Sequence, residues 1–253
     1  MEQQFSKQEG WDARAEEFSK VNGDKYHEAF GKFEPAGTNE EVAAQVQAIL
    51  EKHASGNFTP DVLKTLHGVI DLTSLTSLDT KESIWKMTDG VNDFEGTRPD
   101  VPNVAAICVY PYFVGTVKQA LTAQNVNIAA VSGGFPASQT FTEIKVAETA
   151  MCVMEGADEI DVVINLGCFM EENYEDLCDE LQEIKDSCHE AKLKVILETG
   201  ALETMENVRK AAILALYSNA DFIKTSTGKG YPGAIPEAAY TMAKVIKQYY
   251  DLT

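Results

Sequence analysis

The chain has 253 residues, of which 44% are hydrophobic and 24% are charged, a composition typical of globular proteins and unlike that of disordered or fibrous ones. Its 21 lysines and arginines against 40 aspartates and glutamates give a formal net charge of −19. This charge repels nucleic-acid phosphates and anionic lipid headgroups, so we expect neither nucleic acid nor a membrane surface as a partner. The apolar runs are also shorter than the ~20 residues that a membrane helix needs.

The cysteines and histidines show no metal-binding or disulfide pattern. None of the five cysteines belongs to a CxxC pair, and none of the four histidines is paired at metal-ligand spacing, so the sequence predicts no metal site. The chain does not open on an Arg-flanked apolar run of the signal-peptide type. We therefore predict a reducing, cytoplasmic location.

Residues 1–66 are rich in Glu, Lys and Gln and contain no strand-like run, which predicts an N-terminal helical extension. Thr38 and Glu41 form a capping box in front of one helix, and the Thr-Pro pair at residues 59–60 is typical of an N-cap followed by Pro at the first helical position. We expect these helices to pack on the main domain or on a partner subunit.

Residues 67–253 form the main domain. Short β-branched runs alternate there with longer segments of helical period, which indicates an α/β protein with a parallel sheet covered by helices. The six candidate strands are Gly68–Thr73, Val104–Tyr110, Asn127–Val131, Glu159–Asn165, Lys194–Thr199 and Phe222–Thr227.

Helices are expected between these strands. Thr140 with Glu143 predicts a capping box, Gly156 ends the helix that follows, and Pro236 opens a last helix that runs to about Tyr250. Between the fourth and fifth strands an apolar stripe at helical spacing should pack on the sheet, formed by Tyr174, Leu177, Leu181, Ile184, Cys188 and Ala191.

Lys224 is the most informative residue, because it lies within an apolar, β-branched strand. Burial disfavours the charged form of lysine, and a neutral amine in a pocket can attack a carbonyl to form a Schiff base. The alternative is a lysine that snorkels from the strand end or pairs with an acid, and the pattern alone favours neither.

Asp161 is a second charged residue in an apolar strand, where period two places it on the same side as Glu159. An inward carboxylate needs a partner, and Lys224 is the obvious candidate. Such a pair could relay protons, or it could be a structural ion pair. Lys194 and Glu198 flank the apolar core of the fifth strand, where we expect an inward structural or supporting role.

The segment that follows Lys224 could bind phosphate, since Thr227, Gly228 and Lys229 supply a hydroxyl, accessible backbone and a cation. Threonine, serine and glycine are also common in ordinary turns. Asp71 lies near the end of the first predicted strand, where capping or turn roles are frequent, and Cys108 is expected to pack in the core or line a pocket. From the residues alone, a six-stranded doubly wound sheet remains an alternative architecture.

Six motifs occur in the order found in the 2-deoxyribose-5-phosphate aldolases, and the chain resembles that family from about Val69 to Tyr250. The last motif is the most specific. The motifs are VIDLTSL, AAICVYP, AAVSGGFP, GADEIDVVIN, LKVILETG and DFIKTSTGK.

The resemblance implies a (β/α)8 barrel of the TIM type and a class I aldolase without metal or organic cofactor. The reaction would be reversible cleavage of 2-deoxy-D-ribose 5-phosphate to glyceraldehyde 3-phosphate and acetaldehyde. Lys224 would form the Schiff base, and Asp161 would be its acid/base partner. Substrate would be bound by a further set of residues: Asp71, Thr73, Cys108, Lys194, Thr227, Gly228 and Lys229.

The sequence departs from the family pattern after the helix that follows the lysine-bearing strand. We therefore expect an incomplete barrel of about six βα units, without the family's second active-site lysine and its Gly-Ala-Ser-Ser-type phosphate loop. This leaves a second hypothesis, a catalytically impaired fragment or a non-catalytic binding or assembly protein with the same fold. A homo-oligomer is compatible with either hypothesis.

Overall fold

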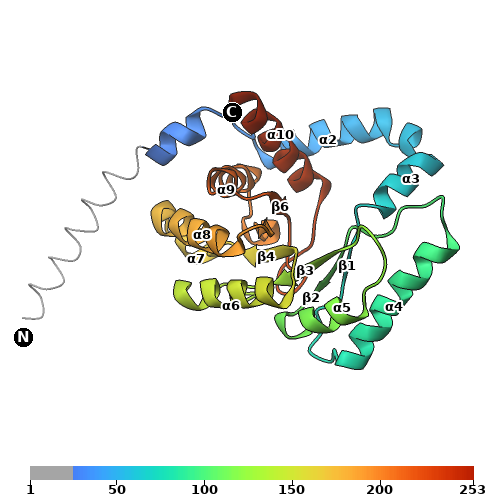
Figure 1. The fold of residues 1–253 in the computed structure, drawn as a ribbon. Helices are drawn as coiled ribbons and strands as arrows, with labels where there is room; N and C mark the ends of the chain where they lie inside the picture. Colours follow the sequence, from blue (N-terminus) through green and yellow to red (C-terminus); the bar gives the residue numbers. More distant parts are fainter. Residues whose placement is uncertain (1–24) are drawn as a thin grey trace, which may run out of the picture.

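The computed structural model describes residues 25–253, and its centre is one parallel sheet that curls into a half-barrel with helices on its outer side (Figure 1). The strands are β1 (Asp71–Thr73), β2 (Ala106–Val109), β3 (Asn127–Val131), β4 (Glu159–Val163), β5 (Lys192–Ile196) and β6 (Phe222–Lys224). The α-helices with assigned bounds are α2 (Asn39–His53), α3 (Pro60–His67), α4 (Lys81–Thr97), α5 (Val114–Ala120), α6 (Thr142–Glu155), α7 (Leu166–Met170), α8 (Tyr174–Cys188), α9 (Met205–Tyr217) and α10 (Pro236–Leu252). Short 3-10 turns are η1 (Ser55–Asn57), η2 (Pro111–Phe113) and η3 (Thr199–Ala201).

The strand order is β1 to β6 without a reversal, and every neighbouring pair is parallel. A doubly wound sheet would reverse its strand order at a switch point, so that alternative is wrong and the barrel-type prediction is confirmed. Within the described residues β1 and β6 each pair on one side, which leaves two open edges.

The two faces of the sheet are lined differently, as period two requires. The inner face carries a small cluster of Ala106, Cys108, Ala129 and Val131, with Tyr110 and Phe135 packed against it. The intervening residues of the same strands face the helices and belong to the main hydrophobic core. The polar side chains of β1, β4, β5 and β6 share the inner hollow with the small cluster.

Most of the predicted helix boundaries are confirmed. Thr38 forms its capping box, Thr59 accepts a hydrogen bond from Val62 N–H ahead of Pro60, and Gly156 ends α6 with φ 107°. The predicted apolar stripe is buried along α8, and α10 begins at Pro236.

The predicted capping box at Thr140 is wrong. Helix α6 begins at Thr142, and its N-cap residue, Phe141, makes no side-chain capping bond. The preceding turn is held instead by Ser138, whose backbone is left-handed with φ 57° and whose hydroxyl accepts a hydrogen bond from Lys145 at 2.8 Å.

Only β3 has the predicted bounds, and the other five strands differ in extent. β1 begins at Asp71 rather than Gly68, and β5 runs from Lys192 to Ile196 rather than from Lys194 to Thr199. β2, β4 and β6 are shorter than predicted, at Ala106–Val109, Glu159–Val163 and Phe222–Lys224. Glu198 has a left-handed backbone, with φ 53°, which directs the chain out of the sheet into η3.

The helical extension packs on the main domain, as one of the two predicted options requires. Residues 25–31 are helical, and the rings of Tyr26 and Phe30 pack against Tyr174 of α8 at centroid distances of 5.7 and 5.4 Å. Val42 and Val46 of α2 are buried in the main core beside α10. Residues 1–24 of the predicted extension lie outside the described residues, and the domain boundary at residue 66 stays a prediction.

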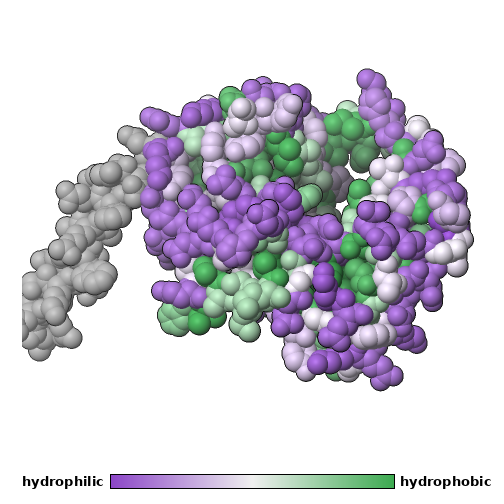
Figure 2. Space-filling model, viewed as in Figure 1, coloured by the Kyte–Doolittle hydropathy of each residue, from purple (hydrophilic) through white to green (hydrophobic). Residues whose placement is uncertain are grey.

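The surface in Figure 2 is largely hydrophilic, with hydrophobic side chains gathered around a notch between the side that carries α10 and the side that carries α3 and α4. Exposed apolar residues on β6 and just before β1 include Phe222, Val69 and Ile70.

Of the helices between residues 25 and 253, none has both the length and the apolar composition needed to cross a bilayer.

Candidate active site

Lys224 and Asp161 meet inside the curled sheet. Asp161 of β4 lies opposite Lys194 of β5, and Lys224 of β6 lies opposite Ile196, two residues farther along β5. The side chains of Asp161 and Lys224 therefore start from nearby positions on the sheet. The Lys224 ammonium donates a hydrogen bond to Asp161 Oδ2, and its nitrogen lies 3.8 Å from Asp71 Oδ2 on β1. Asp161 is fully buried, whereas the Lys224 side chain is 29% exposed. The amine is thus both paired and accessible.

Lys194 forms a second ion pair across the hollow. Its ammonium donates to Asp71 Oδ2 at 2.6 Å and contacts the Glu159 carboxylate. Lys194 and Glu159 are both nearly fully buried. The ion pair therefore bridges β1, β4 and β5, and it fixes Asp71 beside Lys224.

The sign of the local charge decides the protonation of Lys224. Three carboxylates, Asp71, Glu159 and Asp161, surround two lysines, so acids outnumber cations in this cluster. Burial is the largest single influence on the pKa of Lys224 and lowers it, but the charge of Asp161 and the hydrogen bond to it act together, and the net result is a raised pKa. The expectation that burial leaves this amine uncharged is wrong for the ion-paired arrangement.

Asp161 has the complementary property. Burial is the largest influence on its carboxyl group and raises its pKa, although Lys224 and Lys194 oppose the shift. Its Oδ1 atom is buried without a hydrogen-bond partner in the structure. Burial thus makes this carboxylate, which contacts the Lys224 ammonium, a stronger base than an exposed aspartate.

Cys108 lines the same hollow, with its sulfur 3.9 Å from Asp161 Oδ2. Burial, with Asp161 next in importance, raises the pKa of the Cys108 thiol to about 12. A thiol with this pKa remains protonated at neutral pH and is a poor nucleophile. Its position agrees with the predicted packing or pocket-lining role.

The predicted phosphate-binding residues follow β6 at the rim of the hollow. Gly228 has φ 73°, a conformation that glycine adopts without strain, and Thr227 lies beside Glu198. The Lys229 ammonium reaches across the hollow to the carbonyl oxygen of Leu75, which follows β1. This contact joins residues 154 apart in sequence, and no local pattern predicts it.

Thr73 is exposed at the end of β1, and its hydroxyl donates to the Asp71 carbonyl oxygen at 2.9 Å. The structure thus gathers Asp71, Cys108, Asp161, Lys194 and Lys224 into one cluster. It leaves Thr73, Thr227, Gly228 and Lys229 at the rim.

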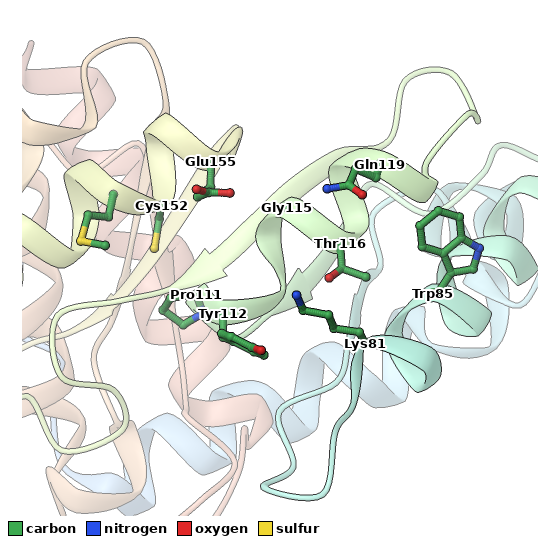
Figure 3. A pocket seen from close by; sticks show the side chains of 10 residues that line it. Lys81, Trp85, Pro111, Tyr112, Gly115, Thr116, Gln119, Cys152 and Glu155 are labelled. Atoms are coloured by element: carbon green, nitrogen blue, oxygen red, sulfur yellow. The ribbon is translucent and has the colours of Figure 1, made fainter.

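A separate cavity of about 610 Å³ lies between α4, α5 and α6 (Figure 3). Trp85, Tyr112 and Lys81 face it on one side and Glu155 on the other. It contains none of the predicted site residues. Across residues 25–253 no group of three or more Cys, His, Asp and Glu side chains is arranged to hold a metal ion.

Comparison with known proteins agrees with this geometry. Residues 66–250 match the model of the DeoC/LacD family aldolases. The deoxyribose-phosphate aldolase of Thermococcus kodakarensis is 40% identical over 180 residues, which cover 70% of this chain and 76% of that protein. The human deoxyribose-phosphate aldolase is 37% identical over 191 residues, which cover 72% of this chain and 60% of the human protein.

Among solved structures, the aldolase QR15 superposes with a TM-score of 0.65 at 31% identity, covering 72% of this chain and 76% of that one. The resemblance inferred from the six motifs is therefore confirmed, over a span in which Lys224 and Asp161 meet inside the half-barrel. The chain belongs to the DeoC/LacD family of aldolases.

Proposed function

We propose that the protein cleaves 2-deoxy-D-ribose 5-phosphate reversibly to glyceraldehyde 3-phosphate and acetaldehyde through a Schiff base on Lys224. The observation that carries the proposal is the contact between the accessible Lys224 ammonium and the buried Asp161 carboxylate. The names of the relatives from Thermococcus kodakarensis and Homo sapiens supply the substrate.

The first step is loss of the proton from Lys224. Its pKa is raised, so the resting amine is protonated and cannot attack a carbonyl. Asp161 contacts that ammonium, and burial makes its carboxylate a stronger base than an exposed aspartate. Transfer of the proton to Asp161 neutralises both groups and releases the nucleophile.

The free amine then adds to the aldehyde carbon of the substrate, and loss of water gives the imine. Protonated imine nitrogen withdraws the electron pair of the C2–C3 bond as the C3 hydroxyl loses its proton, which releases glyceraldehyde 3-phosphate and leaves the enamine of acetaldehyde. Protonation of the enamine carbon and hydrolysis of the imine complete the cycle. Asp161 is the nearest group able to move these protons, and Asp71, held by Lys194, is 3.8 Å from the same nitrogen.

The phosphate end of the substrate is assigned to the rim. Lys229 carries the charge there, and Thr227 and Gly228 precede it on the same loop. Cys108 borders the reacting end beside Asp161, and Thr73 lies at the rim. No metal or organic cofactor has a part in this chemistry.

Reductive trapping tests the proposal. The full chain is incubated with acetaldehyde and borohydride, and peptide mapping is expected to place one ethyl group on Lys224. Lys224→Met should abolish this adduct. Lys192→Met removes an exposed lysine of β5 and should leave the adduct intact. A well-folded wild-type chain that carries no adduct at Lys224 would reject the mechanism.

The open edges of β1 and β6 favour a second candidate, a non-catalytic protein that binds or completes itself with another chain. Absence of trapping together with a stable complex would support it.

For location we propose the cytoplasm, since all five cysteines are free thiols and a reducing compartment keeps them so. As partners we propose a small phosphorylated sugar and further copies of the same chain in a homo-oligomer. We propose no nucleic-acid partner.

A further inference from the structure

The loop between β6 and α10 is held at two places by the turn that follows β5. The Glu198 carboxylate accepts hydrogen bonds from the Thr227 backbone N–H, at 3.2 Å, and from the Thr227 hydroxyl. Farther along, Gly200 lies so close to the loop that a Cβ atom there would stand 2.5 Å from the Pro232 carbonyl oxygen. One turn therefore fixes both the beginning and the far part of the loop.

Glu198 occupies an unfavourable position for an ordinary structural residue. It is 2% exposed, and its backbone is left-handed with φ 53°. Burial of a carboxylate and a left-handed backbone each cost free energy unless the surrounding structure compensates. The hydrogen bonds from the backbone and hydroxyl of Thr227 offset the burial of this carboxylate.

The hydrogen bonds around Thr227 have one possible direction. An ionised carboxylate can only accept, so the Thr227 hydroxyl proton points at Glu198. The same hydroxyl oxygen then accepts from the Lys229 backbone N–H at 3.1 Å. The chain of contacts runs from Glu198 through the Thr227 hydroxyl to the backbone of Lys229.

We propose that Glu198 is a positioning residue that sets the affinity for the phosphate end of the substrate by orienting the backbone of Thr227, Gly228 and Lys229. This inference rests on the proposed function, because it takes the loop to be where phosphate binds. It also redefines Thr227, whose hydroxyl holds the loop instead of donating to the ligand.

The test compares Glu198→Ala with Glu203→Ala in the full chain. Glu203 is a matched control, because it lies in the same connection, has a similar left-handed backbone with φ 62°, and exposes its side chain. KM is measured for 2-deoxyribose 5-phosphate and for 2-deoxyribose, and inorganic phosphate serves as a competing anion. Glu198→Ala should weaken phosphate inhibition. It should also raise the KM for 2-deoxyribose 5-phosphate, relative to the KM for 2-deoxyribose, by about tenfold, the effect of losing one hydrogen bond to a charged group.

Glu198→Gln distinguishes orientation from negative charge. The glutamine carbonyl can accept from the Thr227 N–H while its amide donates to the Thr227 oxygen, so the loop stays in place. Phosphate inhibition should therefore stay within about twofold of wild type or become stronger, because the hydroxyl proton is released. If Glu198→Gln weakens inhibition as much as Glu198→Ala, the positioning argument fails. Thr227→Val, which lacks the hydroxyl, should resemble Glu198→Ala.

Amide hydrogen exchange provides a readout that does not depend on turnover. The amides of Thr227 and Lys229 should exchange faster in Glu198→Ala than in Glu203→Ala. Equal exchange and equal KM ratios in these two variants, with the Lys224 adduct still formed, would overturn the inference and leave the proposed function standing. Loss of the Lys224 adduct in wild type would instead reject the proposed function.

Discussion

Replacement of Asp161 by Asn separates two consequences of one contact. Asparagine has nearly the same shape, but it removes the negative charge beside Lys224 and the base that accepts its proton. Two unit charges about 4 Å apart attract each other by about 4 kcal/mol at an effective dielectric constant of about 20. The Lys224 side chain is 29% exposed, so solvent screening makes this figure an upper bound.

Without that attraction, burial, already the largest single influence on the Lys224 amine, is no longer opposed by the charge at position 161. Burial lowers the pKa of a lysine, and Asp161 is what outweighs it in the wild-type chain. The pKa of Lys224 should therefore fall in Asp161→Asn, and its amine should become neutral at lower pH. Turnover should nevertheless fall by about 10²–10⁴, because the group that moves protons is lost.

The assay measures two quantities as a function of pH. The rate of borohydride trapping with acetaldehyde reports the free amine, and kcat with 2-deoxyribose 5-phosphate reports the complete cycle. We expect the trapping midpoint of Asp161→Asn to move to lower pH while kcat falls. Glu159→Gln is the matched control, since it removes a charge from the same strand but contacts Lys194. A midpoint that moves to higher pH, or one that moves equally in both variants, would refute the reasoning.

Three further predictions concern stability, each measured by urea unfolding. Lys145→Met should lower the free energy of unfolding by about 3–5 kcal/mol, because it removes the buried ammonium that lies 2.7 Å from the Glu180 carboxylate and leaves that carboxylate without its cation. Adding Glu180→Leu should recover most of the loss. Burial raises the pKa of Asp221, but the hydrogen bonds that its carboxylate accepts outweigh burial and lower the pKa below 3.8. The contribution of Asp221 to the free energy of unfolding is therefore present above pH 3.8 and is lost as the pH falls through the pKa of the folded state. Asp221→Asn should thus be less stable at neutral pH and lose less stability on acidification; parallel pH curves would contradict this. Gly156→Ala should cost about 1 kcal/mol or more, since φ is 107° there, and an unchanged unfolding midpoint would contradict it.

Much of the architecture could be predicted because it depends on local pattern. The alternation of strands and helices predicts the parallel α/β class, and the six strands appear where the β-branched runs lie. Period two places Glu159 and Asp161 on one side of β4, and both contact lysines there. The capping box predicted at Thr140 is absent, and the turn before the helix is held instead by a hydrogen bond from the buried Lys145 to Ser138. Such a competing contact depends on burial, which local sequence does not specify.

The candidate site was predicted in composition but not in its electrostatics. Lys224 stands out in any reading of its strand, yet the direction of its pKa shift depends on how many acids surround it. Asp71 and Lys194 are 123 residues apart, and only the curl of the sheet brings them together. A supporting role was expected for Glu198, but its partner, Thr227, lies on a different strand connection and is identified only by the folded structure.

The sequence by itself determined the kinds of groups available: a carboxylate in one apolar strand, an amine in another, and a threonine-glycine-lysine loop after the lysine. Side-chain alternation along a strand is a local property, so no folded structure was needed to place Glu159 and Asp161 on one side of their strand. The tertiary structure decided the pairings, the protonation of Lys224 and the anchoring of the loop. Coulombic attraction and desolvation depend on distances between groups far apart in the chain, and folding alone sets those distances.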